Sequence, residues 1–243
     1  MQIPSYLLNT HYNDRYFDVV NAVHEAKQVF FKGTFLLEKL HYSIKNPKQI
    51  SIGETGFGPG RNLLSLIDYL NETGLHNIHV TYNTCELHPV STDKMSMILE
   101  CFREQVGNRI DQVISFYNRI DIATPGWHHE EMEFPFGKIS FNLWIGEALE
   151  MVEALENPCD IWFLDGHGPK TNPQIWRREL LLAIGKKTCS GGTCATYTVA
   201  GEVKRSLTEA GFKVEKVPGC GGKKEVLRGV KQDICGAGFT DMP

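Results

Sequence analysis

Residues 54–60 combine a carboxylate with glycines at every second position, a combination suited to holding a small ligand. Glycine tolerates positive φ and lets a ligand approach the backbone closely. The loop follows a short apolar alternation at residues 49–53 and precedes an amphipathic run at residues 61–71. We therefore expect a strand, a tight loop and a helix whose N-terminal N–H groups face the ligand. The carboxylate is Glu54, and the loop glycines are Gly56, Gly58 and Gly60.

The spacing within this loop narrows the class of ligand. No Lys followed by Ser or Thr comes after the last glycine, which excludes a phosphate-cradling Walker loop. The glycines follow G-x-G-x-G rather than the G-x-G-x-x-G of dinucleotide-binding folds. With an acidic residue two positions before the first glycine, the loop looks like the first motif of class I S-adenosylmethionine (SAM) methyltransferases. A glycine-rich turn without a ligand is the alternative for this motif taken alone.

Three further carboxylates follow the ends of expected strands. Glu86 comes after the strand at residues 78–84, where such folds hold a pair of ribose hydroxyls. Asp165 ends a short buried strand, and Glu147 follows the strand at residues 138–145 and is placed like the adenine-side carboxylate of SAM enzymes. An ordinary surface carboxylate is the alternative for Glu86. An acid that favours the start of a helix is the alternative for Glu147.

The elements that must position these residues alternate along the chain. Expected strands cover residues 49–53, 78–84, 138–145, 161–164, 193–197, 213–217 and 225–230. Expected helices cover residues 61–71, 91–102, 149–156, 174–184 and 199–210. Residues 129–134 are expected to pair with residues 138–145 as a hairpin, while the rest of residues 103–137 gives no clear pattern.

This order predicts the α/β fold class, a class I SAM-dependent methyltransferase (Rossmann-like) sheet. The sheet is expected to be mostly parallel, with an antiparallel C-terminal edge hairpin. Residues 49–243 form the expected methyltransferase domain. Residues 1–48 form a small N-terminal extension packed on it, with a strand at residues 16–20 and a helix at residues 23–31.

Composition excludes several classes of protein. The 243 residues are 42% hydrophobic and 22% charged, as in ordinary globular proteins. Seven cysteines, an odd number with no C-x-x-C pair, indicate reduced thiols in a cytoplasmic protein rather than disulfides or zinc. The nine histidines lack ligand spacing, so we expect no metal. No apolar run approaches the roughly 18 residues of a membrane span, so we expect no membrane association.

Charge is distributed unevenly along the chain. Residues 1–167 carry 12 Lys or Arg and 22 Asp or Glu. Residues 168–243 carry 13 Lys or Arg and 7 Asp or Glu. A basic C-terminal third is what a face that binds a polyanion would require. A lysine-rich solvated surface without a partner is the alternative.

With these residues in view, the chain resembles the methyltransferase domain of the tRNA-modification enzyme MnmC. Members of that family carry a glycine loop like residues 53–58 and a second signature, Asp-Gly-Phe-Ala-Pro-x-x-Asn-Pro-x-x-Trp. Here the second signature reads DGHGPKTNPQIW at residues 165–176. Further matches lie at residues 125–128, 143–147, 196–201, 209–212 and 221–225. The glycine loop is common to many enzymes, whereas the second signature is specific to the family.

The resemblance implies SAM-dependent methylation of the exocyclic amine of 5-aminomethyl-(2-thio)uridine at the tRNA wobble position, giving the 5-methylaminomethyl nucleoside. The expected cofactor is SAM, with no metal and no flavin, because the resemblance does not include the flavin oxidase domain of the full MnmC protein. The expected partners are the anticodon stem-loop of tRNA and a separate enzyme that supplies the aminomethyl-uridine.

The resemblance also suggests roles for residues. Asp165 is the expected catalytic residue, either as a base or only as a group that binds SAM or the substrate amine. His167 and Trp176 are candidates to stack on the base, with core packing as the alternative for Trp176. The expected cofactor-binding residues are Glu54, Gly56, Gly58, Gly60, Glu86, Glu147 and Asp165. The expected substrate or RNA contacts are His167, Gly168, Pro169, Lys170, Trp176, Lys204, Arg205, Lys223 and Lys224.

The chain departs from the family pattern at several of these positions. His167 and Gly168 stand where Phe and Ala are usual, so base recognition at the pocket mouth is expected to differ. Glu147 stands where Asp is usual. Gly222 and Lys224 stand where Arg is common. Lysine lacks the planar fork of arginine, so RNA contact there is expected to be looser.

Two other functions fit the same sequence. The first is a SAM-fold enzyme that transfers a methyl or aminopropyl group to a small-molecule amine. The second is a relative without catalytic activity that retains the fold to bind RNA or protein.

Overall fold

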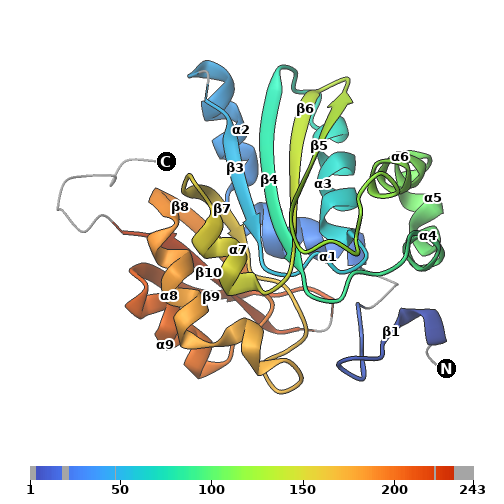
Figure 1. Cartoon of the computed structure of the whole chain (residues 1–243). Helices are drawn as coiled ribbons and strands as arrows, with labels where there is room; N and C mark the ends of the chain where they lie inside the picture. Colours follow the sequence, from blue (N-terminus) through green and yellow to red (C-terminus); the bar gives the residue numbers. More distant parts are fainter. Residues whose placement is uncertain (1–3, 18–21, 47, 222, 233–243) are drawn as a thin grey trace.

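The computed structural model describes residues 4–17, 22–46, 48–221 and 223–232, and its centre is a sheet of eight strands (Figure 1). The strand order is β5-β6-β4-β3-β7-β8-β10-β9. The strands are β3 (Ile50–Glu54), β4 (Ile78–Glu86), β5 (Gly126–Phe134), β6 (Gly137–Ile145), β7 (Cys159–Phe163), β8 (Thr188–Thr196), β9 (Phe212–Pro218) and β10 (Glu225–Lys231).

Strand direction confirms the predicted fold class. The five strands from β6 to β8 run parallel, and β5 pairs antiparallel with β6 as the expected hairpin. At the other edge β10 is antiparallel to both of its neighbours, β8 and β9. The C-terminal hairpin therefore folds back so that its second strand, β10, lies inside the sheet, and β9 forms the edge and runs parallel to the central strands.

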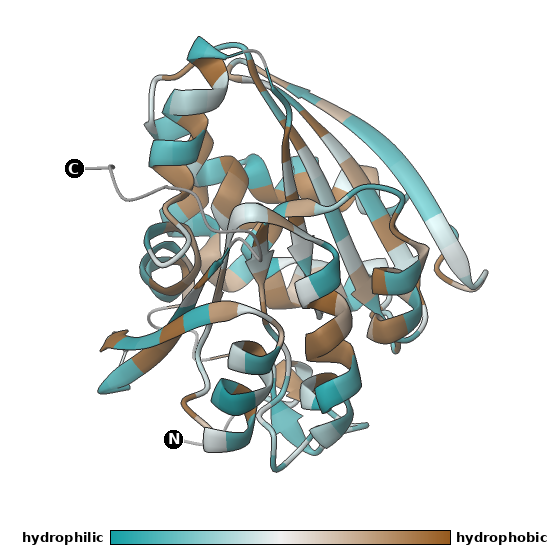
Figure 2. Cartoon of the chain, turned by 90° about the vertical axis from the view of Figure 1, so that its left-hand side faces the viewer, coloured by the Kyte–Doolittle hydropathy of each residue, from teal (hydrophilic) through white to brown (hydrophobic). Residues whose placement is uncertain are grey.

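Helices cover both faces of the sheet (Figure 1). The helices are α1 (Ala22–Ala26), α2 (Leu36–Lys45), α3 (Arg61–Glu72), α4 (Thr92–Leu99), α5 (Arg103–Val106), α6 (Arg109–Tyr117), α7 (Ala148–Ala154), α8 (Arg178–Lys186) and α9 (Gly201–Glu209). One buried cluster joins α1, α3, α4 and α6 to the sheet, and a second joins α7, α8 and α9 to the opposite face. Hydrophobic and hydrophilic bands alternate along these helices (Figure 2), as expected where one side of a helix packs on a sheet.

Local sequence explains the strand, loop and helix that begin the sheet. A side chain at Gly53 would collide with Trp162, since a Cβ built there lies 2.5 Å from the indole ring. Gly60 has φ +78°, which closes the loop directly before α3. Further along, the Ser91 hydroxyl accepts a hydrogen bond from the Lys94 backbone N–H at 3.2 Å and caps α4.

Three expected elements differ from the structure or lie partly outside the described residues. The helix expected over residues 174–184 is divided into a 3-10 turn, Pro173–Trp176, and α8, because Arg177 between them has extended backbone (φ −62°, ψ 146°). The helix expected at residues 23–31 is α1 followed by a π-helix, Lys27–Lys32. Of the strand expected at residues 16–20, residues 16 and 17 lie outside any strand and the rest lie outside the described residues.

The N-terminal segment shares its core with the rest of the chain. Its hairpin, β1 (Leu8–Asn9) and β2 (Asp14–Arg15), forms a separate two-stranded sheet. Phe17 and Phe30 belong to the same buried cluster as α3 and the central strands. The Thr34 carbonyl accepts a hydrogen bond from the Thr193 hydroxyl of β8 at 2.8 Å. Residues 4–17 and 22–46 thus contribute directly to the structure around the sheet.

Candidate active site

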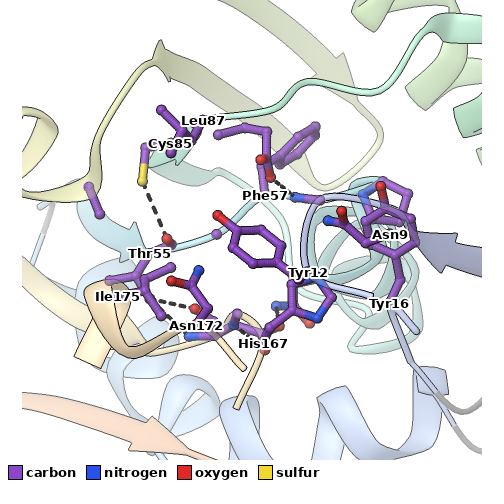
Figure 3. Close-up of a pocket in the computed structure, with 18 of the residues that line it drawn as sticks. Asn9, Tyr12, Tyr16, Thr55, Phe57, Cys85, Leu87, His167, Asn172 and Ile175 are labelled. Carbon is purple, nitrogen blue, oxygen red and sulfur yellow. Dashed lines mark hydrogen bonds between the residues drawn. The ribbon is translucent and has the colours of Figure 1, made fainter. Parts of the chain in front are cut away.

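A cavity of about 190 Å³ lies at the carboxyl ends of the central strands (Figure 3). Five segments line it: the N-terminal hairpin, the glycine loop with the start of α3, the end of β4, the start of α7, and the loop after β7. The carboxyl ends of parallel strands are where open α/β sheets bind ligands. The two sequence signatures, far apart along the chain, meet here.

The glycine loop forms one wall of the cavity. Gly58 has φ +54°, and a Cβ at this residue would lie 3.6 Å from the Tyr16 ring. Its backbone N–H donates to Glu86 Oε2 at 2.8 Å, and the N–H of Phe57 donates to the Cys85 carbonyl at 2.9 Å. The loop is therefore fastened to the end of β4. Gly56 also lines the cavity, whereas Gly60 lies just behind it at the start of α3.

Glu86 and Glu147 bring carboxylates to the same wall. Glu86 accepts from the N–H of Gly58 and, through Oε1, from the N–H of His88 at 2.9 Å. These two bonds leave further lone pairs on the carboxylate for a ligand hydroxyl. Glu147 lines the cavity at the start of α7 and accepts from Arg177 Nη1 at 3.0 Å. The cofactor contacts of both residues stay predictions.

Glu54 lies behind the cavity wall. Its residue is 1% exposed, and the carboxyl group accepts from Asn62 Nδ2 and from the Thr84 hydroxyl, each at 2.7 Å. Burial and the neighbouring charge of Asp165 raise the pKa of Glu54 to about 8. The Glu54 carboxyl thus lies outside the cavity lining, and its contact with the cofactor stays a prediction.

Asp165 lies in the cavity wall, and both of its carboxylate oxygens accept hydrogen bonds. Its Oδ2 accepts from Arg61 Nη2 at 2.8 Å and from Asn62 Nδ2 at 2.7 Å, and its Oδ1 accepts from the N–H of Gly166 at 2.8 Å. The Asp165 backbone exchanges two hydrogen bonds with the Thr55 hydroxyl, at 2.8 and 3.0 Å. The two sequence signatures thus form a single hydrogen-bonded unit.

His167 lies at the mouth of the cavity among residues of the N-terminal hairpin. Its ring centroid lies 4.8 Å from that of Tyr12 and 6.0 Å from that of Tyr16, and its Nδ1 lies 3.5 Å from Asp14 Oδ2. The Tyr12 side chain points into the cavity (Figure 3). His167 therefore packs on the N-terminal hairpin, and its stacking on a base stays a prediction.

Trp176 has a different surrounding. It is 7% exposed, belongs to the buried cluster under α7 to α9, and donates its indole N–H to the His167 carbonyl at 2.7 Å. This arrangement agrees with the core-packing alternative, and the tryptophan anchors the loop that carries His167.

The predicted RNA contacts are spread around this end of the molecule. Pro169 and Arg205 line a second groove, with Trp176 at its base. The Lys223 ammonium lies 5.1 Å from the centroid of the Tyr197 ring. Gly168, Lys170 and Lys224 are exposed, and Lys204 is half-buried. Their role in RNA binding stays a prediction.

The sequence interpretation missed Arg61, Asn62, Tyr12 and Tyr16, all of which line the cavity. One signal was available in the sequence: Arg61 opens a helix at the end where the dipole disfavours a cation. The two tyrosines carry no such signal, because only the tertiary fold brings the N-terminal hairpin to the cavity.

The described residues lack two other kinds of feature. Among them, no group of three or more His, Cys, Asp or Glu is arranged to hold a metal ion. No helix in the described ranges has the length and apolar character needed to cross a bilayer.

Comparison with known proteins identifies relatives of the whole chain. A family model described as S-adenosyl-L-methionine-dependent methyltransferase matches residues 115–232. The tRNA 5-methylaminomethyl-2-thiouridine biosynthesis bifunctional protein MnmC of Pseudomonas syringae pv. syringae is 32% identical over 221 residues, 90% of this chain and 32% of that protein. Its counterpart from Stutzerimonas stutzeri is 33% identical over 234 residues, 96% of this chain and 34% of that protein. The chain spans about a third of the length of these curated relatives.

A solved structure supports the fold. The crystal structure of MNMC2 from Aquifex aeolicus superimposes with a TM-score of 0.70 at 22% identity, covering 91% of this chain and 65% of that one. The comparisons confirm the predicted fold class and the predictions that the chain is a methyltransferase and uses SAM.

Proposed function

We propose that this chain is a member of the MnmC methyltransferase family and methylates the exocyclic amine of 5-aminomethyl-(2-thio)uridine at the wobble position of tRNA. One observation carries the proposal. The two family signatures, the glycine loop and the Asp165–Trp176 run, line one cavity and are joined by hydrogen bonds. The curated relatives, about 32% identical over 90% of the chain, are named for biosynthesis of the methylated nucleoside.

The residues of the cavity fit SAM. Gly56 and Gly58 line the cavity, and the absence of a Cβ lets a ligand approach the loop backbone closely. Glu86, at the end of the second parallel strand, is placed to accept hydrogen bonds from a ribose. Glu147, Asp165 and Glu86 together give the wall a negative charge suited to a sulfonium and an ammonium group. Phe57, Leu87 and Ile175 supply apolar surface for an adenine ring.

SAM, when bound, supplies a methyl group on a positively charged sulfur that is already an activated leaving group. The protein therefore needs mainly to align the substrate amine with that methyl group. The amine must be neutral to attack, and Asp165 is the polar group in the wall that reaches it from the loop after β7. His167, between Tyr12 and Tyr16, would stack on the uracil ring and hold the aminomethyl group over Asp165.

The tRNA would approach across the end of the sheet where the cavity opens. Lys170 and Lys204 lie on the loop after β7 and on α9, and Arg205 lines the neighbouring groove. Lys223 and Lys224 lie on the turn before β10. Contacts of this kind to phosphates position the RNA without reading its sequence. A separate activity would supply the aminomethyl-uridine.

The direct test uses the purified chain with SAM and two tRNA preparations, one bearing the aminomethyl-uridine and one from cells that cannot make it. Nucleosides are released by digestion and weighed. We expect the mass of one added methylene group on the modified uridine of the first preparation and no change in the second. No mass gain in either would refute the tRNA proposal.

The same assay distinguishes the other functions. Methylation of a small amine such as a polyamine, without reaction on tRNA, would indicate a small-molecule transferase. Calorimetry with SAM addresses a relative without activity, which would bind RNA but release no heat on addition of SAM.

A further inference from the structure

The position of Arg61 is unfavourable for a positive charge for two reasons. It is the first residue of α3, where the helix dipole repels a cation, and it is only 6% exposed. Removing a charge from water is costly unless partners compensate for it. Residues that break such local rules are expected at functional sites. Arg61 also lines the cavity that holds Asp165.

The contacts of Arg61 fix its guanidinium in one place. Its Nη2 donates to Asp165 Oδ2 at 2.8 Å and to Asn62 Oδ1 at 2.9 Å, and Nε donates to the same amide oxygen at 3.1 Å. Aromatic rings pack against it, with the Cζ atom 5.7 Å from the centroid of Phe17 and 5.4 Å from that of Tyr197. The planar group is thus held against Asp165 rather than turned to solvent.

The hydrogen bonds of Asp165 leave a single place for a ligand. A carboxylate offers about four lone-pair sites. Oδ2 uses two of them for Arg61 and Asn62, and Oδ1 uses one for the N–H of Gly166. One acceptor site remains, and it is on Oδ1.

We propose that Arg61 is a positioning residue that holds the Asp165 carboxylate in one orientation, so that Asp165 Oδ1 orients the substrate amine by accepting its N–H. This inference rests on the proposed amine methylation. In the step, the amine lone pair forms the N–CH3 bond, the S–CH3 bond breaks with its electron pair on sulfur, and the resulting ammonium loses its proton to water.

Other charged and titratable groups face this pair. Glu54 of β3 contacts Asn62 from behind, and its raised pKa keeps it mostly neutral at pH 7. Tyr197, after β8, packs on Arg61, and Lys223 lies over the same ring.

The decisive variant is Arg61→Met, compared with Arg61→Lys and wild type in the tRNA assay. We expect Arg61→Met to lower kcat at least tenfold with a smaller change in KM for SAM, because the Asp165 carboxylate is no longer held in one orientation. Arg61→Lys should restore part of the rate, because lysine keeps the charge without the fork. A kcat that is unchanged or higher in Arg61→Met would overturn the proposal.

A second measurement does not require turnover. Unfolding free energies of wild type, Arg61→Met, Asp165→Asn and the double variant form a cycle that isolates the pair. We expect a coupling of at least tenfold in the unfolding equilibrium constant, and additive effects would overturn the fixed pair. If wild type methylates no tRNA but the coupling appears, the substrate proposal fails and the pairing stands.

Discussion

Replacement of Glu54 by Gln tests the electrostatics behind the cavity. The carboxyl group is fully buried and accepts from Asn62 and from the Thr84 hydroxyl. Glutamine has the same shape, its amide oxygen can accept from Asn62, and its NH2 can donate to the threonine oxygen. The substitution therefore removes a titration and keeps the packing.

The magnitude follows from the pKa of Glu54, which burial and Asp165 raise from 4.5 to about 8. Between these values the folded protein retains a proton that the unfolded chain has released. The stabilisation is therefore fully present below pH 4.5 and is lost as the pH rises through 8. Integrating the linkage relation from pH 5 to pH 8 shows that Glu54 alone lowers the free energy of unfolding by about 3 to 4 kcal/mol over this range.

The assay is denaturant unfolding of wild type and Glu54→Gln at several pH values between 5 and 8.5. We expect the stability of the variant relative to wild type to improve by about 3 to 4 kcal/mol across this range. Glu153 is an exposed residue on α7, and Glu153→Gln is the matched control. Its unfolding free energy should show the same pH dependence as that of wild type. Parallel curves for wild type and Glu54→Gln would show that Glu54 is ionised in the folded protein and would refute the reasoning.

Three further outcomes are expected. Trp176→Phe removes the hydrogen bond from the indole N–H to the His167 carbonyl. It should lower the free energy of unfolding in denaturant by about 1 to 2 kcal/mol and raise KM for tRNA more than KM for SAM. Equal changes in the two KM values would contradict the anchoring role. Glu86→Ala should weaken SAM binding in calorimetry at least tenfold, about 1.4 kcal/mol, and an unchanged Kd would remove Glu86 from the cofactor site. The double variant Lys223→Ala, Lys224→Ala should weaken tRNA binding and lower the slope of log K against log salt by about 1 to 2. Lys45→Ala on α2 is the control and should change neither. The same slope in both variants would show that Lys223 and Lys224 do not contact the RNA.

The sequence predicted those features that depend on local pattern. Strand periodicity and the glycine spacing placed β3, the loop and α3 within a residue or two, because a glycine at φ +78° and an amphipathic run specify this turn locally. The break at Arg177 could not be predicted, since it accompanies a tertiary contact in which the neighbouring Trp176 indole reaches the His167 carbonyl. The sequence pattern also gave no order for the last two strands, because periodicity does not say which strand of a hairpin lies inside the sheet.

Among the site residues, the sequence identified the groups at strand ends but not their partners. Asp165 was predicted as the chemical group from its place after a buried strand. Its hydrogen-bond partner Arg61 lies 104 positions earlier in the chain. Such a pair becomes visible only when β3 and β7 are neighbours in the sheet. The same holds for Tyr12, which reaches the cavity from a hairpin outside the main sheet.

The two carboxyl groups that share Asn62 explain why the fold needs this arginine. Asn62 Nδ2 donates to both Glu54 and Asp165, so the two groups lie close enough to repel each other if both are ionised. Glu54 accepts from a hydroxyl and an amide, and burial together with the neighbouring charge of Asp165 raises its pKa to about 8. The Asp165 carboxylate is instead held by Arg61 Nη2 at 2.8 Å. The arrangement thus separates the roles of two similar acids: the one behind has a raised pKa, and the one facing the cavity is held by a guanidinium where a substrate amine can meet it.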